Sequence, residues 1–295
     1  MTKTEGSCKG MESSENSMLR PLWDALLDVY CEFAKLCDAN GLKHYVVEGN
    51  AIGALRHGGF IPWDDDFDVA MPRPDYERLR KICQTGLPSH LKLLDWRSAP
   101  EMQYMMGKIQ DCREKLVHEV EGKIGRMLAD GIYIDILVID AMPDGRLKRK
   151  AYKLNRRIHD AIRRRWGTPF ADWRWRGKII WLLGWLFSWI LGVGSKAEAY
   201  SAAEKFMKSV RFGSTGTTWR EGASPRTTNM EIPARVWNGV KMVSFEGLSV
   251  PIPAGYDEYL RMQYGDYMTP PKQCFRKSTH ARTAYSPWWK GPTKL

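Results

Sequence analysis

The 295-residue sequence lacks the features that identify several common classes of protein. Its six cysteines are scattered, with no C-x-x-C pair and no Cys/His cluster at zinc spacing, so no structural metal is implied. No segment repeats along the chain, which excludes solenoid, collagen-like and coiled-coil architectures. The polar residues 1–17 contain no apolar run of the kind found in signal peptides. These absences favour a cytoplasmic globular protein with free thiols.

The excess positive charge of the chain is confined to one segment. The formal net charge is +11, and the residues from Arg146 to Lys178 include 13 Lys or Arg but only two acidic residues. The rest of the chain is therefore electrically neutral. This distribution indicates a neutral protein with one strongly cationic segment, and it argues against a protein that coats itself in nucleic acid.

The spacing of apolar residues predicts a mixed sheet flanked by helices, which is an α/β or α+β fold. Apolar residues recur at three- and four-residue spacing from Met18 to Asn40, which indicates an amphipathic helix that stops at Gly41. Residues 1–17 are expected to form a disordered tail, and the Gly-, Ser- and Thr-rich residues 212–226 a loop. Further helices are expected at 50–56, 74–83, 147–165, 179–193, 197–210 and 256–264, and strands at 44–47, 66–71, 91–94, 104–110, 116–120, 132–139 and in a pair around 243–252.

The acidic run that follows Trp63 is the most informative stretch. In an extended strand alternate side chains share a face, so Asp64, Asp66 and Asp68 are expected to point one way, and Asp65 the other. Three carboxylates in a row repel one another unless divalent cations neutralise them. Mg²⁺ and Mn²⁺ prefer such oxygen ligands.

A further carboxylate, Asp135, lies inside the apolar strand 132–139, where burial without a cation or a donor costs several kcal/mol. Adjacent strands would bring Asp135 beside Asp66 and Asp68. Together they would complete a two-metal site that clamps the attacking and leaving oxygens of a phosphoryl transfer.

Two structural explanations compete with a metal site. A calcium loop beginning at Asp64 fails, because its sixth position is Val69 instead of Gly and its twelfth is Asp75 instead of Glu. A solvated turn fits poorly with the apolar alternation that follows, although spacing alone leaves it open.

The residues before the acidic run are suited to binding an anion. Gly49 and Gly53 let the backbone approach a ligand, and the amides that open the next helix form an anion-binding end. Arg56 and His57 lie one to two turns on, where the guanidinium could bind phosphate oxygens. The two glycines could equally belong to an ordinary turn, and Arg56 and His57 to the end of a surface helix, so these structural alternatives stay open.

Residues 49–77, GNAIGALRHGGFIPWDDDFDVAMPRPDYE, resemble the signature of the LicD family, to which fukutin and fukutin-related protein are similar. Matching blocks follow at 131–136 and between 245 and 267, so the resemblance spans about residues 20 to 280. It implies an α+β fold, a nucleotidyltransferase-like mixed sheet flanked by helices, into which a basic, Trp-rich helical segment is inserted.

The resemblance also implies roles for individual residues. Asp66 and Asp68 form the paired-carboxylate motif and Asp135 the third carboxylate, which together bind two Mg²⁺ or Mn²⁺ ions, and Asp64 is the candidate base. Asn50 stands where Ser or Thr is often found. The residues expected to contact the donor or its phosphates are Gly49, Asn50, Arg56, His57, Lys108, Arg276 and His280.

Members of this family transfer phosphocholine or a related phospho-alcohol from a CDP-linked donor, such as CDP-choline, to a glycan. The resemblance therefore implies a phosphotransferase that releases CMP and acts on a cell-surface glycan, with the acceptor still attached to its lipid carrier. Two alternatives remain open, a nucleotidyltransferase that leaves NMP on a small molecule or an RNA end, and an inert membrane-bound scaffold.

The segment after the basic region has the composition of a membrane interface. Residues 179–195 carry no charge, and Trp181, Trp185 and Trp189 recur every four residues, which places them on one helical face. The 17 residues are at the lower limit for crossing a bilayer. We expect this face to lie on an anionic membrane surface at the inner face of the cell membrane. A buried helical hairpin and a nucleic-acid-binding segment are the alternatives.

The expected organisation has four parts. They are a disordered tail at 1–17, a catalytic core at 18–145, the membrane-interface insertion at 146–195 and the C-terminal part of the same domain at 196–295.

Overall fold

A mixed sheet forms the centre of the protein. The computed structural model describes residues 5–99, 102, 104–113, 116–118, 131–167, 175–220, 230–273, 276 and 282–285. Seven strands make up the sheet: β1 Tyr45–Val46, β2 Asp68–Pro72, β3 Leu91–Leu94, β4 Gly107–Asp111, β6 Ile132–Met142, β7 Thr217–Arg220 and β8 Ile232–Pro233. Their order is β1–β2–β6–β4–β3, with β7 also paired to β6 and β8 to β7. β2 and β6 are parallel and the other pairs antiparallel, so the predicted mixed sheet is confirmed.

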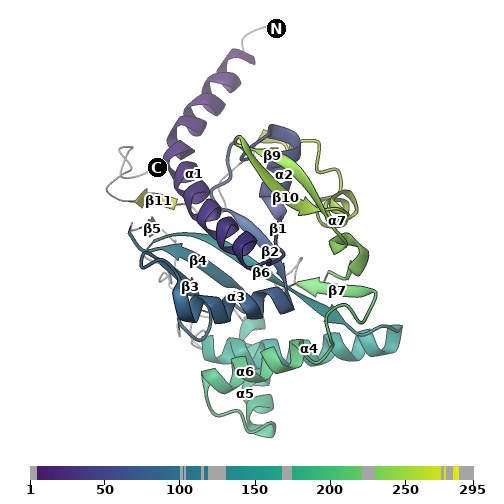
Figure 1. The fold of residues 1–295 in the computed structure, drawn as a ribbon. Coiled ribbons are helices and arrows are strands. Elements are labelled where there is room, and N and C mark those ends of the chain that lie inside the picture. Colours follow the sequence, from purple (N-terminus) through teal and green to yellow (C-terminus); the bar gives the residue numbers. More distant parts are fainter. Residues whose placement is uncertain are drawn as a thin grey trace.

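Helices and a hairpin cover the sheet. The helices are α1 Glu5–Ala39, α2 Glu48–His57, α3 Arg73–Gly86, α4 Arg146–Gly167, α5 Trp175–Ile190, α6 Lys196–Met207, α7 Tyr256–Tyr264 and the 3₁₀ helix η2 Ala234–Trp237. The hairpin consists of β9 Val240–Phe245 and β10 Leu248–Pro253, and β5 Leu116–His118 pairs with β11 Arg282–Tyr285. Figure 1 shows α1 running along the sheet and α4, α5 and α6 grouped below it.

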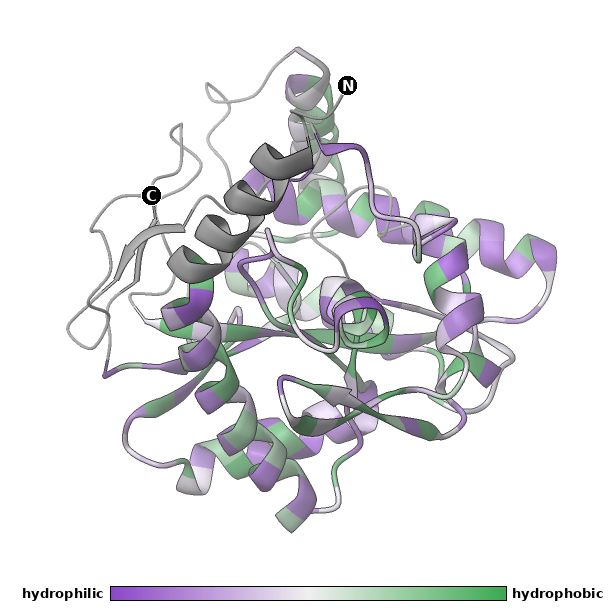
Figure 2. Cartoon of the chain, turned by 90° about the horizontal axis from the view of Figure 1, so that it is seen from above, coloured by the Kyte–Doolittle hydropathy of each residue, from purple (hydrophilic) through white to green (hydrophobic). Residues whose placement is uncertain are grey.

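The largest core lies between α1, the sheet, β10 and α7. One face of α1 buries large apolar side chains, among them Leu22, Leu26 and Phe33, which is the amphipathic pattern that the sequence predicted. The helix ends as expected, since Gly41 adopts a φ of 58° and Leu42 N bonds to Cys37 O. Figure 2 shows both hydrophilic and hydrophobic residues around the helices, while the strands are mainly hydrophobic. All 11 residues of β6 are buried, which is typical of a central strand covered on both faces.

Two expectations about irregular segments are wrong. Residues 5–17 continue helix α1 instead of forming a disordered tail, because a helix anchored by packing further along adds residues at little cost. Residues 1–4 lie outside the described residues. The segment 212–226 contains β7, because pairing with β6 and β8 and the burial of Trp219 outweigh its loop-like composition.

The helices α4 to α6 connect two strands that are neighbours in the sheet, β6 and β7. They contribute to a second, smaller core that contains Tyr152 and Ile162 of α4, Tyr200 of α6 and Trp219 of β7. The predicted boundary at residue 195 falls between α5 and α6, and α6 packs with α4 in this core.

Candidate active site

Two aspartates lie side by side where β2 and β6 pair. In the parallel register Asp68 is opposite Asp135, and Asp135 is opposite Lys108 of β4 on its other side. The pairing begins one residue earlier, since Asp135 N donates to Phe67 O at 2.9 Å. We expected adjacent strands to bring Asp135 beside Asp66 and Asp68. The strand register places Asp135 opposite Asp68.

The acidic run before β2 keeps its alternation although most of it is not in a strand. β2 begins at Asp68, two residues later than predicted. Asp65 and Phe67 are buried, whereas Asp64, Asp66 and Asp68 are half-buried, so these three share the more open side. The indole Nε1 of Trp23 donates to Asp64 O at 2.8 Å and anchors the start of the run.

Asn50 and Gly49 position this run from α2. Asn50 Nδ2 donates to Asp66 O at 3.1 Å, and Asn50 Oδ1 accepts from Asp68 N at 2.7 Å, so the amide clamps the backbone on both sides of Phe67. At Gly49 an added Cβ would lie well under 3.0 Å from Asp64 Oδ2 and 3.3 Å from its Cγ. Asn50 therefore fixes the backbone of the acidic run, and Gly49 leaves room for the Asp64 carboxylate.

Negative charge is in excess around Asp68, which has three carboxylates and one lysine as its charged neighbours. Burial raises the pKa of the Asp68 carboxyl well above its usual value, the carboxylates of Asp66, Asp135 and Asp64 raise it further, and Lys108 lowers it. Carboxylates this close destabilise one another's charge, and a divalent cation would relieve the repulsion. The donor set, composed of hard oxygens, matches Mg²⁺ or Mn²⁺.

Lys108 is a direct neighbour of one of these carboxylates. Its ammonium group forms a buried ion pair with Asp135 Oδ1 and lies 3.9 Å from the centroid of the Tyr133 ring. The expected contact with donor phosphates stays a prediction. Within the described ranges no three His, Cys, Asp or Glu side chains converge as metal ligands, so the two-metal site stays a prediction as well.

Two arginines that are far apart in the sequence meet near the acidic run. Burial and the nearby guanidinium of Arg276 lower the pKa of Arg56. Arg56 donates from Nε to His57 Nε2 at 2.9 Å and from NH1 to Tyr267 O at 2.7 Å. Arg276 lies over the ring of Trp63, 5.3 Å from its centroid. The positive charge of Arg276 disfavours the protonated form of Arg56, and a bound anion would relieve this repulsion.

The remaining predicted site residues lie elsewhere. His280 falls outside the described residues. Trp185 and Trp189 of α5 are exposed and Trp181 is half-buried, and the expected binding of the three to a membrane interface stays a prediction. A four-residue step advances slightly more than one helical turn, which carries Trp181 round towards the packed side. Within the described parts of the chain, no helix is both long and apolar enough to cross a membrane.

Sequence reasoning missed a buried polar network beside the carboxylates. Glu48, at the start of α2 with a φ of 52°, pairs with the fully buried Arg220 and accepts from Tyr259 OH at 2.6 Å, and Gln263 and Tyr264 also donate to it. Burial raises the pKa of Tyr259 to about 12, and the charge of Asp68 contributes to this increase, so the network lies within electrostatic reach of Asp68. The only indication of this network in the sequence was that Glu48 directly precedes Gly49, one of the predicted site residues.

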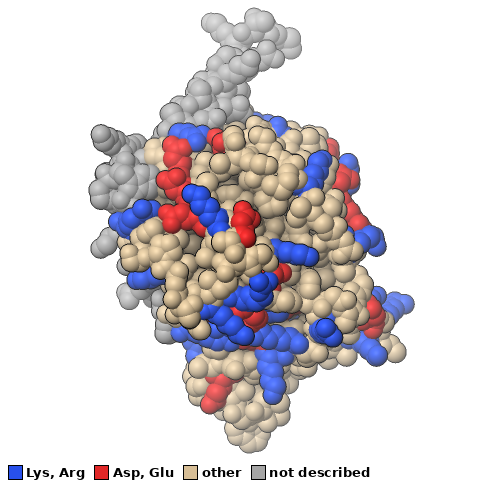
Figure 3. All heavy atoms as spheres, viewed as in Figure 1, with Lys and Arg blue, Asp and Glu red and all other residues tan. Residues whose placement is uncertain are grey.

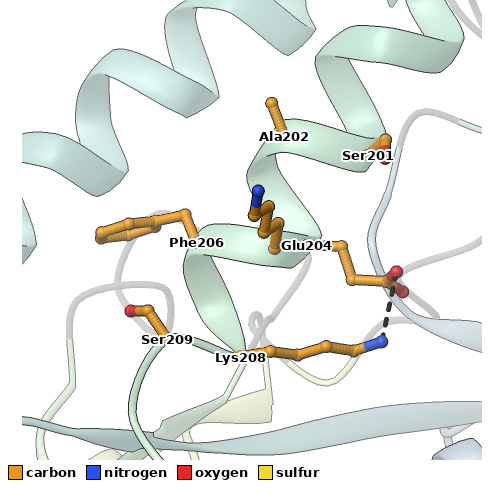
Figure 4. A pocket seen from close by; sticks show the side chains of 7 residues that line it. Ser201, Ala202, Glu204, Phe206, Lys208 and Ser209 are labelled. Atoms are coloured by element: carbon orange, nitrogen blue, oxygen red, sulfur yellow. Dashed lines mark ion pairs between the residues drawn. The ribbon is translucent and has the colours of Figure 1, made fainter.

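A hollow of about 730 Å³ opens beside α6, lined by residues that include Glu204, Phe206, Lys208 and Ser209. Figure 4 shows Lys208 and Glu204 of this hollow joined by an ion pair, with Nζ and Oε2 3.4 Å apart. None of the predicted site residues lines it.

Comparison with known proteins places the acidic run within a family. Residues 41–119 match the family model described as LicD/FKTN/FKRP, nucleotidyltransferase domain. The chain is 28% identical to the lipopolysaccharide cholinephosphotransferase LicD of Haemophilus influenzae over 267 residues, which cover 88% of this chain and 94% of that protein. An uncharacterized protein of Rickettsia prowazekii is 29% identical over 110 residues, 37% of each chain. Residues 41–119 are therefore similar to the LicD family domain, and the similarity of the chain to a LicD protein extends over most of its length.

Proposed function

We propose that the protein is a metal-dependent phosphotransferase that moves phosphocholine, or a similar phospho-alcohol, from a CDP-linked donor to a cell-surface glycan and releases CMP. The observation that supports this most directly is the carboxylate pair Asp68 and Asp135, flanked by Lys108, in a chain that is similar over most of its length to a lipopolysaccharide cholinephosphotransferase. The proposed acceptor is a lipopolysaccharide glycan, still attached to its lipid carrier at the inner face of the cell membrane.

The proposed reaction is a displacement at phosphorus. A hydroxyl of the acceptor attacks the phosphorus that bears the alcohol, a bond forms between that phosphorus and the acceptor oxygen, and the bond to the bridging oxygen of CMP breaks. Asp64 accepts the proton of the hydroxyl. Arg56 and Arg276 bind the phosphate oxygens of the donor. Lys108 orients the Asp135 carboxylate through their buried ion pair.

Asp66, Asp68 and Asp135 are the proposed ligands of two Mg²⁺ or Mn²⁺ ions. Their mutual repulsion and their oxygen-only chemistry support this assignment. A bound divalent ion at this position would neutralise negative charge on the transferred phosphoryl group.

A second candidate is a nucleotidyltransferase, which the description of the matched family model favours. Such an enzyme would attack the α-phosphorus of a nucleoside triphosphate and release pyrophosphate instead of CMP. The products therefore distinguish the two reactions.

The decisive experiment incubates the purified protein with Mg²⁺, a panel of CDP-alcohols and a lipopolysaccharide oligosaccharide, and follows the products by ³¹P NMR and chromatography. We expect CMP and a new phosphodiester with CDP-choline or a related donor, and neither product after addition of EDTA. Pyrophosphate from a nucleoside triphosphate would establish the second candidate. Absence of turnover with every donor, in a folded protein, would favour an inert scaffold.

A further inference from the structure

Helix α5 exposes most of its Trp, Leu and Ile side chains and buries its small residues. The residues that face the protein include Gly184 and Ser188, where an added Cβ on Gly184 would lie well under 3.0 Å from Ala161 O of α4, and Ser188 Oγ bonds to Gly184 O at 2.6 Å. The opposite face presents Trp175, Ile179, Leu182, Leu186 and Trp189, at spacings of three and four residues. Trp175 is 67% and Trp189 75% exposed.

This arrangement is the reverse of that in an ordinary surface helix, in which the apolar stripe faces the core. The small residues allow α5 to pack closely on α4, so the helix is held in place without burying its Trp, Leu and Ile side chains. Exposed apolar surface of this extent marks a binding site in a soluble protein.

The exposed surface continues onto α4 and becomes basic there. Leu147, Lys150, Leu154 and Arg157 lie on the same face of α4 as Ala161, the residue that α5 covers, because their spacing follows the helical repeat. All four are exposed, Leu147 by 80% and Leu154 by 61%. We call the outward residues of α5 together with these four the α4–α5 face. In the view of Figure 3, Lys and Arg gather at the level of α4 and α6, above an almost uncharged projection at the place of α5.

The structure also shows which cations of the basic segment are already paired. Arg156 and Arg163 contact Asp160, which their charges hold at a lowered pKa. Arg149 and Lys153 contact Glu231. The exposed basic side chains of α4 are Arg146, Lys148, Lys150, Arg157 and Arg164.

We propose that the α4–α5 face binds the surface of an anionic lipid bilayer, with α5 lying in the plane of the interface. The outward Trp, Leu and Ile side chains of α5 enter the boundary between headgroups and acyl chains, and Lys150 and Arg157 contact anionic headgroups. Trp side chains favour this depth, since the indole ring is apolar and its N–H group donates a hydrogen bond to the polar headgroup layer. α5 lies on the bilayer and does not cross it.

Charge argues against a second copy of the chain as the occupant. A two-fold contact through this face would place the basic residues of one α4 against those of the other or close to them, and like charges repel. An anionic bilayer supplies the complementary charge to the cations and an apolar phase to the exposed side chains.

The test is sedimentation of the full-length protein with vesicles of phosphatidylcholine alone or mixed with phosphatidylglycerol. Two variants alter the face, Leu182→Gln/Leu186→Gln/Trp189→Gln for its apolar part and Lys150→Gln/Arg157→Gln for its charge. Two matched controls remove exposed side chains of the same kinds elsewhere, Val240→Thr/Met242→Gln on β9 and Lys43→Gln/Lys92→Gln. Circular dichroism and urea unfolding confirm that each variant is folded.

We expect the wild-type protein to bind the anionic vesicles at about 0.05 M salt and to lose most of this binding at about 0.5 M. The charge variant should bind about 30-fold more weakly at low salt, which corresponds to about 1 kcal/mol for each cation. The apolar variant should bind about 100-fold more weakly at both salt concentrations, and the controls should bind as the wild type does.

Three results would overturn the proposal. They are no binding of the wild-type protein to anionic vesicles at low salt, equal losses in the variants and their controls, and a wild-type dimer in solution that the apolar variant converts to a monomer. The last result would identify the face as a contact between copies of the chain.

Discussion

Replacing Gly49 with alanine tests whether the position of the Asp64 carboxylate matters for catalysis. The added Cβ would lie well under 3.0 Å from Asp64 Oδ2 and 3.3 Å from Cγ, so the carboxylate must move by about 1 Å to restore van der Waals contact. A displacement of this size in a reacting group lowers turnover by about 100-fold. Folding stability should change by less than about 1 kcal/mol, since a short half-buried side chain can rotate away.

The assay measures kcat for release of CMP, and urea unfolding gives stability. Gly86→Ala at the end of α3 is the matched control, because a Cβ there meets nothing within 4 Å, and its activity should equal that of the wild type. The double variant Gly49→Ala/Asp64→Asn should be no slower than Asp64→Asn alone, since Gly49→Ala acts by displacing a carboxylate that Asp64→Asn has already removed. Turnover of Gly49→Ala within threefold of the wild type would refute the role of Asp64. A further loss in the double variant would show that Gly49 instead gives a ligand access to the backbone.

Three further outcomes are expected. Asp68→Asn and Asp135→Asn should each reduce transfer by more than about 100-fold. Asp68→Asn should also make the metal-free protein more resistant to urea, because it removes a carboxylate whose charge is disfavoured by desolvation and by neighbouring carboxylates. Arg220→Met should lower the free energy of unfolding by about 3 to 5 kcal/mol, since it leaves a buried glutamate without its cation, whereas the exposed pair control Arg235→Met should cost less than about 1 kcal/mol. Burial lowers the pKa of His44 to about 4, so protonation favours the unfolded chain as pH falls below about 6.5. Between pH 7 and pH 4 this should remove about 3 kcal/mol of stability, a loss that is absent in His44→Phe when both proteins are compared by urea unfolding.

The strands that carry the carboxylates could be predicted because their signals are local. Apolar alternation after Asp68 and the apolar run around Asp135 identify β2 and β6 within a few residues. The register that places these two residues opposite each other depends on contacts between distant segments, which no local pattern specifies. The sequence pattern therefore indicated that the aspartates lie on neighbouring strands, but the pairing of Asp68 with Asp135 could be seen only in the fold.

The network around Glu48 could not be predicted for the same reason. Arg220 lies in a segment whose Gly, Ser and Thr content is typical of a loop, so neither its strand nor its burial was apparent. The two bonds of Asn50 to the acidic run could not be predicted either, because an amide can bind a phosphate or a backbone, and its expected contact with the donor stays a prediction.

Helix α5 shows a different limit of sequence reasoning. Periodicity indicated an apolar helix, but it could not decide which side packs against the protein. Close packing through Gly184 on α4 settles the orientation and turns Trp181 towards the protein. The sequence gives the number of cations in the basic segment but not their partners. In the structure, four of them form ion pairs with Asp160 or Glu231.

The site requires more of the chain than the segment that matches the family model. Residues 41–119 contain β2 and β4, but these strands are not neighbours, because β6 lies between them and pairs with both. Asp135, which stands between Asp68 and Lys108, belongs to β6, and the partners of Glu48 come from β7 and α7. Without β6 the edges of β2 and β4 would be unpaired, and Lys108 would lose its carboxylate partner. The arrangement of Asp68, Asp135 and Lys108 is therefore a property of the whole sheet, and the similarity to the LicD cholinephosphotransferase likewise extends well beyond the acidic run.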